Sequence, residues 1–251
     1  MTIWQISGDG DGLAIGGNHF IHAVRRNIDL NMILLNNRIY GLTKGQYSPT
    51  SERGFVSKSS PYGTVEDPFH PAELAFGARG RFFARCIAVD GAASVEVLKA
   101  AANHKGASVV EVLQNCVIFN DKTHAAFAGD KATRQEHTIT LRHGEKMLFG
   151  ANNEKGLVFE DMRLKVVTVG QDGYTLDKIL THDAHTKDTT LHSMLAAMKY
   201  PDYPVALGVI RSVEDEIVYD QAVEKQVEEV KAQSKIHCVD DLLHSGATWE
   251  I

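Results

Sequence analysis

A glycine-rich stretch near the start of the chain combines bare backbone with carboxylates. Residues 8–18 read GDGDGLAIGGN, which places Asp9 and Asp11 between glycines. Glycines let backbone N–H groups approach a phosphate closely, whereas carboxylates repel phosphate. A divalent cation between the two removes this conflict. The stretch therefore predicts a site for a phosphate-bearing ligand and its metal.

A second polar stretch supports the metal hypothesis. Asn36 and Asn37 follow an apolar run at residues 31–35, and Asp9 follows an apolar stretch at residues 2–7. Ligands of open α/β sheets bind at the carboxyl ends of neighbouring parallel strands, so we expect Asp9 and Asn37 to lie together. A carboxylate, an amide oxygen and a backbone carbonyl are donors that Mg²⁺ prefers, with diphosphate oxygens completing the octahedron. This arrangement is typical of a thiamine diphosphate site.

Two other interpretations of the glycine stretch remain open at this point. A dinucleotide-binding loop needs G-x-G-x-x-G and an acidic residue at the end of the second strand. Here Leu13 stands where the third glycine belongs, the second strand ends in Asn36 and Asn37, and Asp29 comes before that strand. The other interpretation is an ordinary tight turn with no ligand.

The elements that must position these residues are predicted from apolar patterns and turn residues. Two βαβ-like units are expected, at residues 2–35 and 81–113, joined by a long ordered loop at 36–67. Ser94 is expected to cap the helix of the second unit, which ends at Asn103. The fold class is therefore α/β, with an open, mostly parallel sheet and helices on both faces. Because the first strand looks buried and begins at once, we expect earlier strands upstream.

The second half of the chain carries fewer signals. Residues 120–160 are polar and irregular, and we expect strands at 162–169 and 204–211 and helices at 188–199 and 218–233. The helix at 218–233 is amphipathic, and its apolar positions are predicted to face inward: Tyr219, Ala222, Val223, Val227 and Val230. We predict a cofactor-binding domain at 1–125 and an extension at 126–251 for scaffold and subunit contacts. The tail at 238–251 is a candidate for docking on a partner.

Composition excludes several classes of protein. The 251 residues are 43% hydrophobic and 23% charged, as in ordinary globular proteins, and the net charge of −6 argues against nucleic-acid binding. Because the sequence has no apolar run long enough for a membrane span and does not start with a basic region followed by an apolar one, we expect neither a membrane span nor a signal peptide. Three scattered cysteines form no disulfide framework and favour a reducing cytoplasm. His182 and His185 have H-x-x-H spacing, but they fall in predicted turns, so no metal site is expected there.

Longer stretches around the glycine motif resemble a known family. GDGDGLAIGGNHFIHAVRRN and LLNNRIYGLTKGQYSPTS resemble the β subunit of the 2-oxoacid:ferredoxin oxidoreductases, and most of all the 2-oxoglutarate and broad 2-oxoacid enzymes. The resemblance continues through SPYGTVEDPFHPAELA and EVLQNCVIFND, and weakly to GATWE near the end. It implies a thiamine diphosphate-binding fold. It also implies oxidative decarboxylation of a 2-oxoacid to acyl-CoA, with electrons passed to ferredoxin, and the expected 2-oxoacid is 2-oxoglutarate.

The resemblance also implies roles for individual residues. The Mg²⁺ ligands correspond to the side chains of Asp9 and Asn37 and the backbone carbonyl of Ile39. Leu42 and Lys44 correspond to positions that shape the 2-oxoacid site, and a lysine there can pair with a substrate carboxylate. The positions implied to line the thiamine diphosphate are Gly8, Asp9, Gly10, Asp11, Gly12, Asn18, His19, Asn37, Ile39, Gly41, Leu42 and Thr43.

An iron–sulfur cluster is implied only in part. Cys116 resembles the last of four cysteine ligands to a [4Fe–4S] cluster. The family's other three ligands lie in its N-terminal part and have no counterpart here, and we expect Cys86 and Cys238 to be structural. We therefore expect that residues are missing upstream, rather than that the cluster is lost.

The implied partners are an α subunit, ferredoxin, the 2-oxoacid and CoA. The α subunit is expected to supply the glutamate that activates the cofactor. The expected assembly is αβ or (αβ)₂. Alternatives are a cluster-free thiamine diphosphate lyase or synthase, and a non-catalytic remnant subunit that stabilises a partner.

Overall fold

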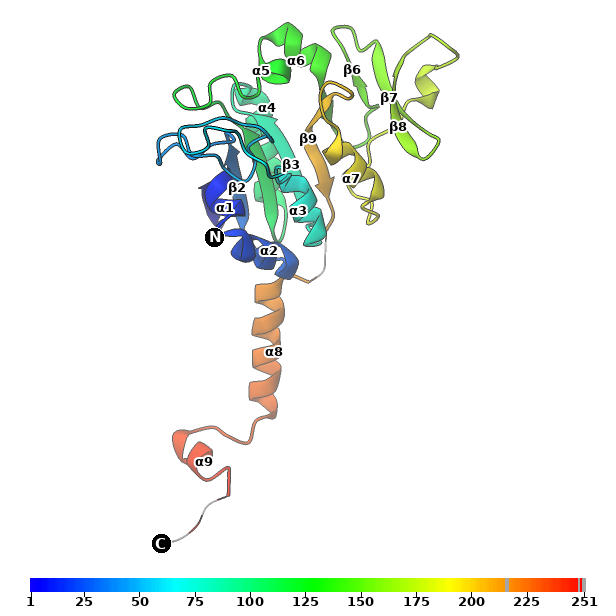
Figure 1. Cartoon of the computed structure of the whole chain (residues 1–251). Helices are drawn as coiled ribbons and strands as arrows, with labels where there is room; N and C mark the ends of the chain where they lie inside the picture. Colours follow the sequence, from blue (N-terminus) through cyan, green and yellow to red (C-terminus); the bar gives the residue numbers. More distant parts are fainter. Residues whose placement is uncertain (215–216, 248, 250–251) are drawn as a thin grey trace.

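The chain is built around a six-stranded, mostly parallel sheet (Figure 1). The computed structural model describes residues 1–214, 217–247 and 249. In spatial order the strands are β1 (Trp4–Gly8), β2 (Asn31–Asn36), β4 (Ser108–Leu113), β3 (Phe82–Ile87), β9 (Val205–Ser212) and β5 (Thr138–Leu141). The first four are parallel neighbours, which confirms the predicted sheet.

β9 departs from the expected pattern. It runs antiparallel to β3 and parallel to β5. Its apolar sequence predicts a buried strand correctly, but a buried strand has the same composition whichever way it runs. The direction of β9 therefore had no signal in the sequence.

Helices cover both faces of the sheet, as predicted. Successive side chains of a strand point to opposite faces, and β3 shows the two layers clearly. Phe83 belongs to the apolar cluster formed with α2 (Gly17–Arg26), α3 (Pro71–Gly77) and α7 (Thr190–Ala197). Its neighbour Phe82 packs in a separate cluster with α4 (Gly91–Asn103).

The ends of two helices differ from the predictions. The segment at 9–13 is not loop but a short helix of its own, α1 (Asp9–Leu13), so α2 begins only at Gly17 and Ile15 is exposed. The cap of α4 is Asp90, whose carboxylate accepts a hydrogen bond from the Ala93 amide at 3.1 Å. Ser94 instead donates to the Ile87 carbonyl.

β1 pairs with β2 as expected, but the prediction that its side chains are buried is wrong. β1 is the edge strand, and Ile6 is 63% exposed, with Ile3 and Trp4 also facing solvent. An apolar alternation shows that a strand has a face to cover, but not that the described residues cover it.

Residues 120–160 are more regular than predicted. They contain α5 (Ala125–Ala128), α6 (Lys131–His137), β5, β6 (Leu148–Phe149) and β7 (Lys155–Glu160). β6, β7 and β8 (Arg163–Thr168) form a separate antiparallel sheet, followed by a 3₁₀ turn at Leu176–Lys178. The predicted strands at 162–169 and 204–211 and the helix at 188–199 are present with slightly different ends.

The predicted division at residue 125 stays a prediction. β5 and β9 come from the second region yet belong to the main sheet. The small antiparallel sheet and the C-terminal helices belong to the second region alone.

The helix α8 (Tyr219–Gln233) projects away from the body and is followed by α9 (Val239–Leu243) (Figure 1). No residue of α8 is buried, so the prediction that its apolar positions face inward is wrong. Residues 248, 250 and 251 lie outside the described part, and so does part of the weak GATWE resemblance and of the candidate docking tail. Among the described residues, no helix is long and apolar enough to cross a bilayer.

Candidate functional site

Asp9 lies where β1 ends and α1 begins, and it is only 1% exposed. Parallel pairing of β1 with β2 places Gly8 opposite Leu35, so both strands end at the same edge of the sheet. One carboxylate oxygen, Oδ2, lies 2.5 Å from the hydroxyl oxygens of both Ser48 and Thr50, which donate to it. The long loop after β2 thus folds back over the first strand and fixes the carboxylate.

The electrostatics of this carboxylate favour a bound cation. Burial raises the pKa of Asp9 above its ordinary value, while hydrogen bonds from Ser48, Thr50 and the Asn37 amide oppose that rise. In the described part of the chain, no lysine, arginine or histidine forms an ion pair with Asp9. A metal ion would supply the missing counter-charge.

The turn at 37–39 offers the neutral oxygens that such a metal needs. The carbonyls of Asn37 and Arg38 both accept from the Asn120 amide group, and Arg38 also accepts from Ser51. Among the described residues, no donor reaches the Ile39 carbonyl. The Asn37 side-chain oxygen accepts from the Ile39 amide at 3.2 Å, which holds it within the turn. The predicted metal ligands are therefore brought together, and the oxygen without a partner is the predicted backbone ligand.

The donor set fits Mg²⁺ better than a softer metal. In the described residues, no group of three or more His, Cys, Asp or Glu side chains could hold a metal ion. One carboxylate with amide and carbonyl oxygens is a hard, oxygen-only set that leaves positions for ligand oxygens.

Two glycines of the motif are required by close packing. A Cβ atom at Gly10 would lie 2.1 Å from the Tyr40 ring, whose hydroxyl donates to the Gly10 carbonyl at 3.0 Å. A Cβ atom at Gly12 would lie 2.6 Å from the Leu34 side chain. Part of the glycine pattern therefore serves the contact of α1 with β2 and with residues 37–40, here called the metal loop, and not only the approach of a phosphate.

Behind the metal loop lies a buried polar network that the sequence interpretation missed. The Asn36 side chain lies 3.0 Å from the Thr50 hydroxyl and donates to Glu111 at 2.7 Å. Glu111 pairs with Arg85 at 2.7 Å, with both side chains almost fully buried. Burial pushes the pKa of Glu111 up, but Arg85 and Asn36 outweigh it and hold that pKa below its ordinary value. The available signal was one charged residue in each of two apolar strands, FFARCI and SVVEVL.

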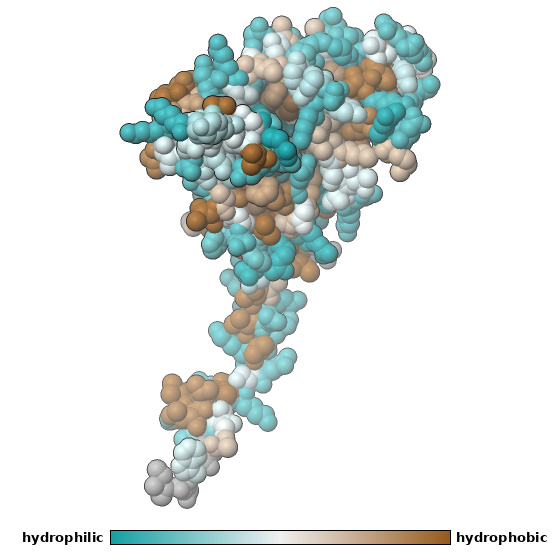
Figure 2. Space-filling model, in the orientation of Figure 1, coloured by the Kyte–Doolittle hydropathy of each residue, from teal (hydrophilic) through white to brown (hydrophobic). Residues whose placement is uncertain are grey.

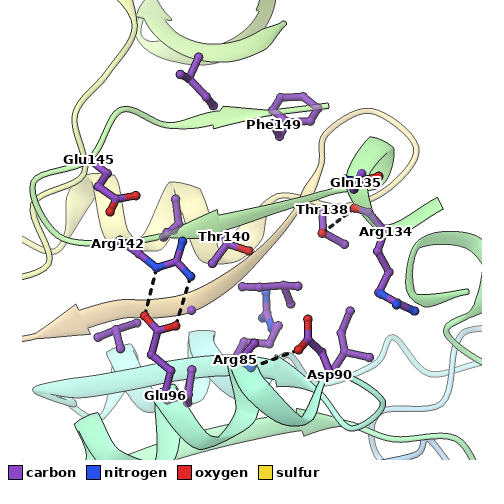
Figure 3. Close-up of a pocket in the computed structure, with 18 of the residues that line it drawn as sticks. Arg85, Asp90, Glu96, Arg134, Gln135, Thr138, Thr140, Arg142, Glu145 and Phe149 are labelled. Atoms are coloured by element: carbon purple, nitrogen blue, oxygen red, sulfur yellow. Dashed lines mark hydrogen bonds and ion pairs between the residues drawn. The ribbon is translucent and has the colours of Figure 1, made fainter. Parts of the chain in front are cut away.

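A large cavity lies elsewhere in the fold. It has a volume of about 1080 Å³ and is enclosed by α4, α6, β5 and the segment before β6 (Figure 3). Its lining mixes cations with acids, and Arg142 donates two hydrogen bonds to Glu96 across it. None of the predicted site residues lines it. A smaller cavity of about 350 Å³ includes Arg38, Thr50 and Glu111 and so adjoins the metal loop.

The comparisons with known proteins agree with this geometry. Residues 1–112 match the family model for the C-terminal TPP-binding domain of thiamine pyrophosphate enzymes. The whole chain is 42% identical to 2-oxoglutarate oxidoreductase subunit KorB of Mycobacterium tuberculosis, of which it covers 67%. This chain belongs to the β-subunit family of the 2-oxoacid:ferredoxin oxidoreductases. The predicted family is therefore confirmed, and its members are β subunits of oxidoreductases.

Other members of the family match a smaller part of the chain. KorB of Archaeoglobus fulgidus, named a 2-oxoglutarate synthase subunit, is 50% identical over 116 residues, which are 46% of this chain and 43% of that protein. The β subunit of a 2-oxoacid:ferredoxin oxidoreductase from Aeropyrum pernix is 45% identical over 129 residues, which are 51% of this chain and 41% of that protein. The chain thus spans about two thirds of one curated relative and less than half of these two.

A solved structure supports the fold. The 2-oxoglutarate:ferredoxin oxidoreductase of Magnetococcus marinus, solved with 2-oxoglutarate, coenzyme A and succinyl-CoA bound, has a TM-score of 0.65 at 24% identity. The match covers 95% of this chain and 65% of that one. The predicted fold class is confirmed, and the domain match supports thiamine diphosphate as the cofactor. Mg²⁺ and the [4Fe–4S] cluster stay predictions.

Several residues that the family resemblance places at the cofactor are not drawn into the Asp9 cluster. Asp11, Asn18 and His19 are exposed on α1 and α2. The turn from Tyr40 to Gln46, closed by pairing of those two residues, carries its tip into solvent. That turn contains Gly41, Leu42, Thr43 and Lys44, and Leu42 is 99% exposed. In this chain alone, these residues form an open surface beside the metal loop.

Cys116 lies close to the metal loop. It pairs through the backbone with Asn120, whose side chain holds the carbonyls of Asn37 and Arg38. Cys116 is half-buried and free, so its thiol is available as a ligand. Cys86 is buried in the core, and Cys238 caps α9, in keeping with structural roles.

The two histidines with H-x-x-H spacing both contact β9. The buried His182 hydrogen-bonds the Val209 carbonyl, and His185 lies 2.5 Å from the Ser212 carbonyl. Both histidines tie the preceding segment to β9.

Proposed function

We propose that this chain is the β subunit of a 2-oxoglutarate-type 2-oxoacid:ferredoxin oxidoreductase. It binds thiamine diphosphate and Mg²⁺ for oxidative decarboxylation of the 2-oxoacid to acyl-CoA, and the electrons pass to ferredoxin. The observation that carries the proposal is the buried carboxylate of Asp9, without a cationic partner in the described residues, beside the unpartnered carbonyl of Ile39. Support comes from family membership over the whole chain.

In this proposal, Asp9, Asn37 and Ile39 hold the Mg²⁺ that anchors the diphosphate. Ser48 and Thr50 occupy Oδ2 of Asp9 and so direct Oδ1 to the metal. Gly8, Gly10, Asp11 and Gly12 lie along the diphosphate, with Asn18 and His19 beside it. When bound, thiamine diphosphate supplies the electron sink that makes loss of carbon dioxide from a 2-oxoacid possible.

The exposed turn at 40–46 serves the reacting end of the cofactor. Gly41, Leu42 and Thr43 cover it, and Lys44 places a cation where a substrate carboxylate can pair with it. Lys44 adopts a left-handed φ of 66°, so the turn has a defined shape even though it is exposed. A partner α subunit closes this open surface and brings the acid–base group that activates the cofactor.

Cys116 supplies one thiolate of the cluster that carries electrons towards ferredoxin. Because its loop is tied to the metal loop through Asn120, a cluster there lies close to the cofactor. The other three thiolates come from elsewhere in the assembly, since Cys86 is buried and Cys238 caps α9.

The test is a pair of matched variants, studied in complex with the partner subunit. Asp9→Asn keeps the shape of the side chain but removes its charge, so we expect Mg²⁺-dependent binding of thiamine diphosphate to weaken by about a hundredfold or more. Asp11→Asn, in the same motif but exposed, should change binding much less. Isothermal titration calorimetry with and without Mg²⁺ measures both.

Stability separates a binding defect from unfolding. Because burial disfavours the ionised carboxylate, Asp9→Asn should leave the metal-free protein at least as stable as the wild type in urea unfolding. Unchanged cofactor affinity in Asp9→Asn would remove the central claim. A Cys116→Ser variant that keeps a normal cluster spectrum in the full assembly would show that the cluster uses another cysteine.

A further inference from the structure

Helix α8 carries an apolar stripe that the described chain leaves largely exposed. Tyr219, Val223, Val227 and Val230 are between 36% and 62% exposed. At 100° per residue they fall within a sector of about 80°, so they form one continuous stripe along the helix. Figure 2 shows apolar surface along the arm below the body. Exposed apolar faces of this kind mark interaction sites.

The base of the arm is held firmly, so the stripe has a defined direction. The side chain of Asn27, the residue that ends α2, donates to the Ile217 carbonyl at 2.9 Å, and the Tyr219 amide donates to the Asn27 carbonyl. The Arg26 guanidinium lies 5.6 Å from the centre of the Tyr219 ring. Asp220 accepts from the Asp29 amide at 3.3 Å. These contacts fix only the first turn of α8 to the body.

We propose that the stripe of α8 pairs with the same stripe of a second copy of this chain, antiparallel, about a two-fold axis. With a rise of 1.5 Å per residue, an axis between Lys225 and Gln226 makes the two stripes interlock. Val230 of one helix then falls between Tyr219 and Val223 of the other, and the two Val227 side chains meet on either side of the axis. The spacing of the apolar residues is thus complementary to itself.

The charged residues beside the stripe also favour the antiparallel arrangement. In an antiparallel pair, two-fold symmetry brings the same flank of each helix together. Asp220 and Lys231 lie on one flank, about 20° apart around the helix, and the axis that interlocks the stripes also places Asp220 opposite Lys231 of the second copy. In a parallel pair the two-fold axis runs along the helices and brings this flank against the opposite flank of the second copy, so Asp220 and Lys231 would not meet. The other cation near the centre, Lys225, is engaged with Glu229 on its own helix at 3.9 Å.

The size of the contact explains why α9 belongs to the same surface. The helix is about 22 Å long, and its four apolar side chains bury less than the roughly 800 Å² per partner of a stable interface. Antiparallel pairing brings the end of one arm to the base of the other. There α9 presents exposed Val239, Leu242 and Leu243 to the body of the second copy. The arm and α9 together therefore make up the pairing surface.

The first experiment measures association of the 251-residue chain by sedimentation equilibrium over a broad range of micromolar concentrations. We expect a monomer–dimer equilibrium. Val223→Asp/Val227→Asp should abolish the dimer, and Lys231→Glu should raise its dissociation constant about tenfold. The charge exchange Asp220→Lys/Lys231→Glu should recover most of that loss, whereas Glu228→Lys, on the opposite side of the helix, should have no effect. Circular dichroism checks that each variant keeps its helix.

The second experiment tests the antiparallel register. In a Cys238→Ser background, Gln226→Cys lies next to the axis in both copies and should be joined by a short thiol-reactive cross-linker. Glu228→Cys, which points away, should not. A monomer at every concentration, equal cross-linking at both positions, or Val223→Asp/Val227→Asp that dimerises normally would overturn the proposal. Recruitment of a different subunit that depends on Val223 and Val227, without self-association, would assign the stripe to that subunit instead.

Discussion

The buried pair of Arg85 and Glu111 offers the sharpest test of how the sheet supports the site. Both side chains are less than a tenth exposed, with 2.7 Å between Arg85 Nε and Glu111 Oε2. Glu111→Gln removes one charge and leaves the arginine buried without its counter-ion, which typically costs about 3–5 kcal/mol. Arg85 keeps a 3.3 Å contact with the Ala206 carbonyl, too weak to compensate.

A double variant separates charge from shape. Arg85→Met/Glu111→Gln removes both charges and keeps an acceptor for the Asn36 amide group, which now donates to Glu111 at 2.7 Å. We expect this variant to be more stable than Glu111→Gln by about 2 kcal/mol or more, because no uncompensated charge remains. Urea unfolding of the metal-free protein measures the difference.

The same variants test the link to the metal loop. Asn36 is held by Glu111 and directly precedes Asn37. In Glu111→Gln the arginine without its counter-ion should displace residue 111 and with it Asn36, which should weaken Mg²⁺-dependent cofactor binding about 10- to 100-fold, as for other outer partners of metal ligands. The double variant should recover part of this affinity. If Glu111→Gln costs less than about 1 kcal/mol, or if the double variant is no better than the single one, the pair does not act as an isolated buried ion pair and the reasoning fails.

Two further predictions concern packing and pH. Gly10→Ala forces a Cβ against the Tyr40 ring, so it should lower the free energy of unfolding in urea by about 1–3 kcal/mol and also weaken cofactor binding. Gly41→Ala is the control, because a Cβ at that position has open space. Equal losses of stability in the two variants would refute the close-contact argument. Burial lowers the pKa of both His104 and His124 to about 4. Between pH 7 and pH 5 these histidines therefore take up protons in the unfolded chain but stay mostly neutral in the folded chain. Stability should therefore fall by about 2 kcal/mol per histidine between pH 7 and pH 5, and His104→Gln should flatten that fall; an unchanged slope would show that His104 is protonated in the fold.

The parts of the fold that follow local rules could be predicted from the sequence. The βαβ order, the buried strands and the long loop after β2 all have short-range signals, and Asp9 and Asn37 meet because parallel strands end at one edge. The direction of β9 could not be predicted, because it depends on which neighbour pairs with it. The cap of α4 moved from Ser94 to Asp90, since both types cap helices well and the choice rests on where β3 ends.

The error on α8 has a different origin. Its apolar spacing is that of a helix with one covered face, and the prediction assumed that the cover comes from the same chain. The structure contains the predicted helix, but its apolar face is exposed rather than packed against the body of the chain. An amphipathic pattern indicates that one face of the helix packs against an apolar surface, but it does not indicate which molecule provides that surface.

The site residues that the sequence interpretation missed share one property: each acts through a contact that spans the fold. Ser48 and Thr50 lie about 40 positions from Asp9 in the chain, yet their hydroxyls fix its carboxylate. Glu111 reaches the metal loop only through Asn36, from the neighbouring strand. A charged residue in a buried strand is costly unless it is paired, so Glu111 and Arg85 persist in the two central strands only as a pair. That pair gives Asn36 a fixed acceptor, and Asn36 in turn sets the start of the loop that carries Asn37 and Ile39. The geometry of the proposed metal site is therefore built from the middle of the sheet outward, and the glycine motif contributes Asp9, the proposed carboxylate ligand.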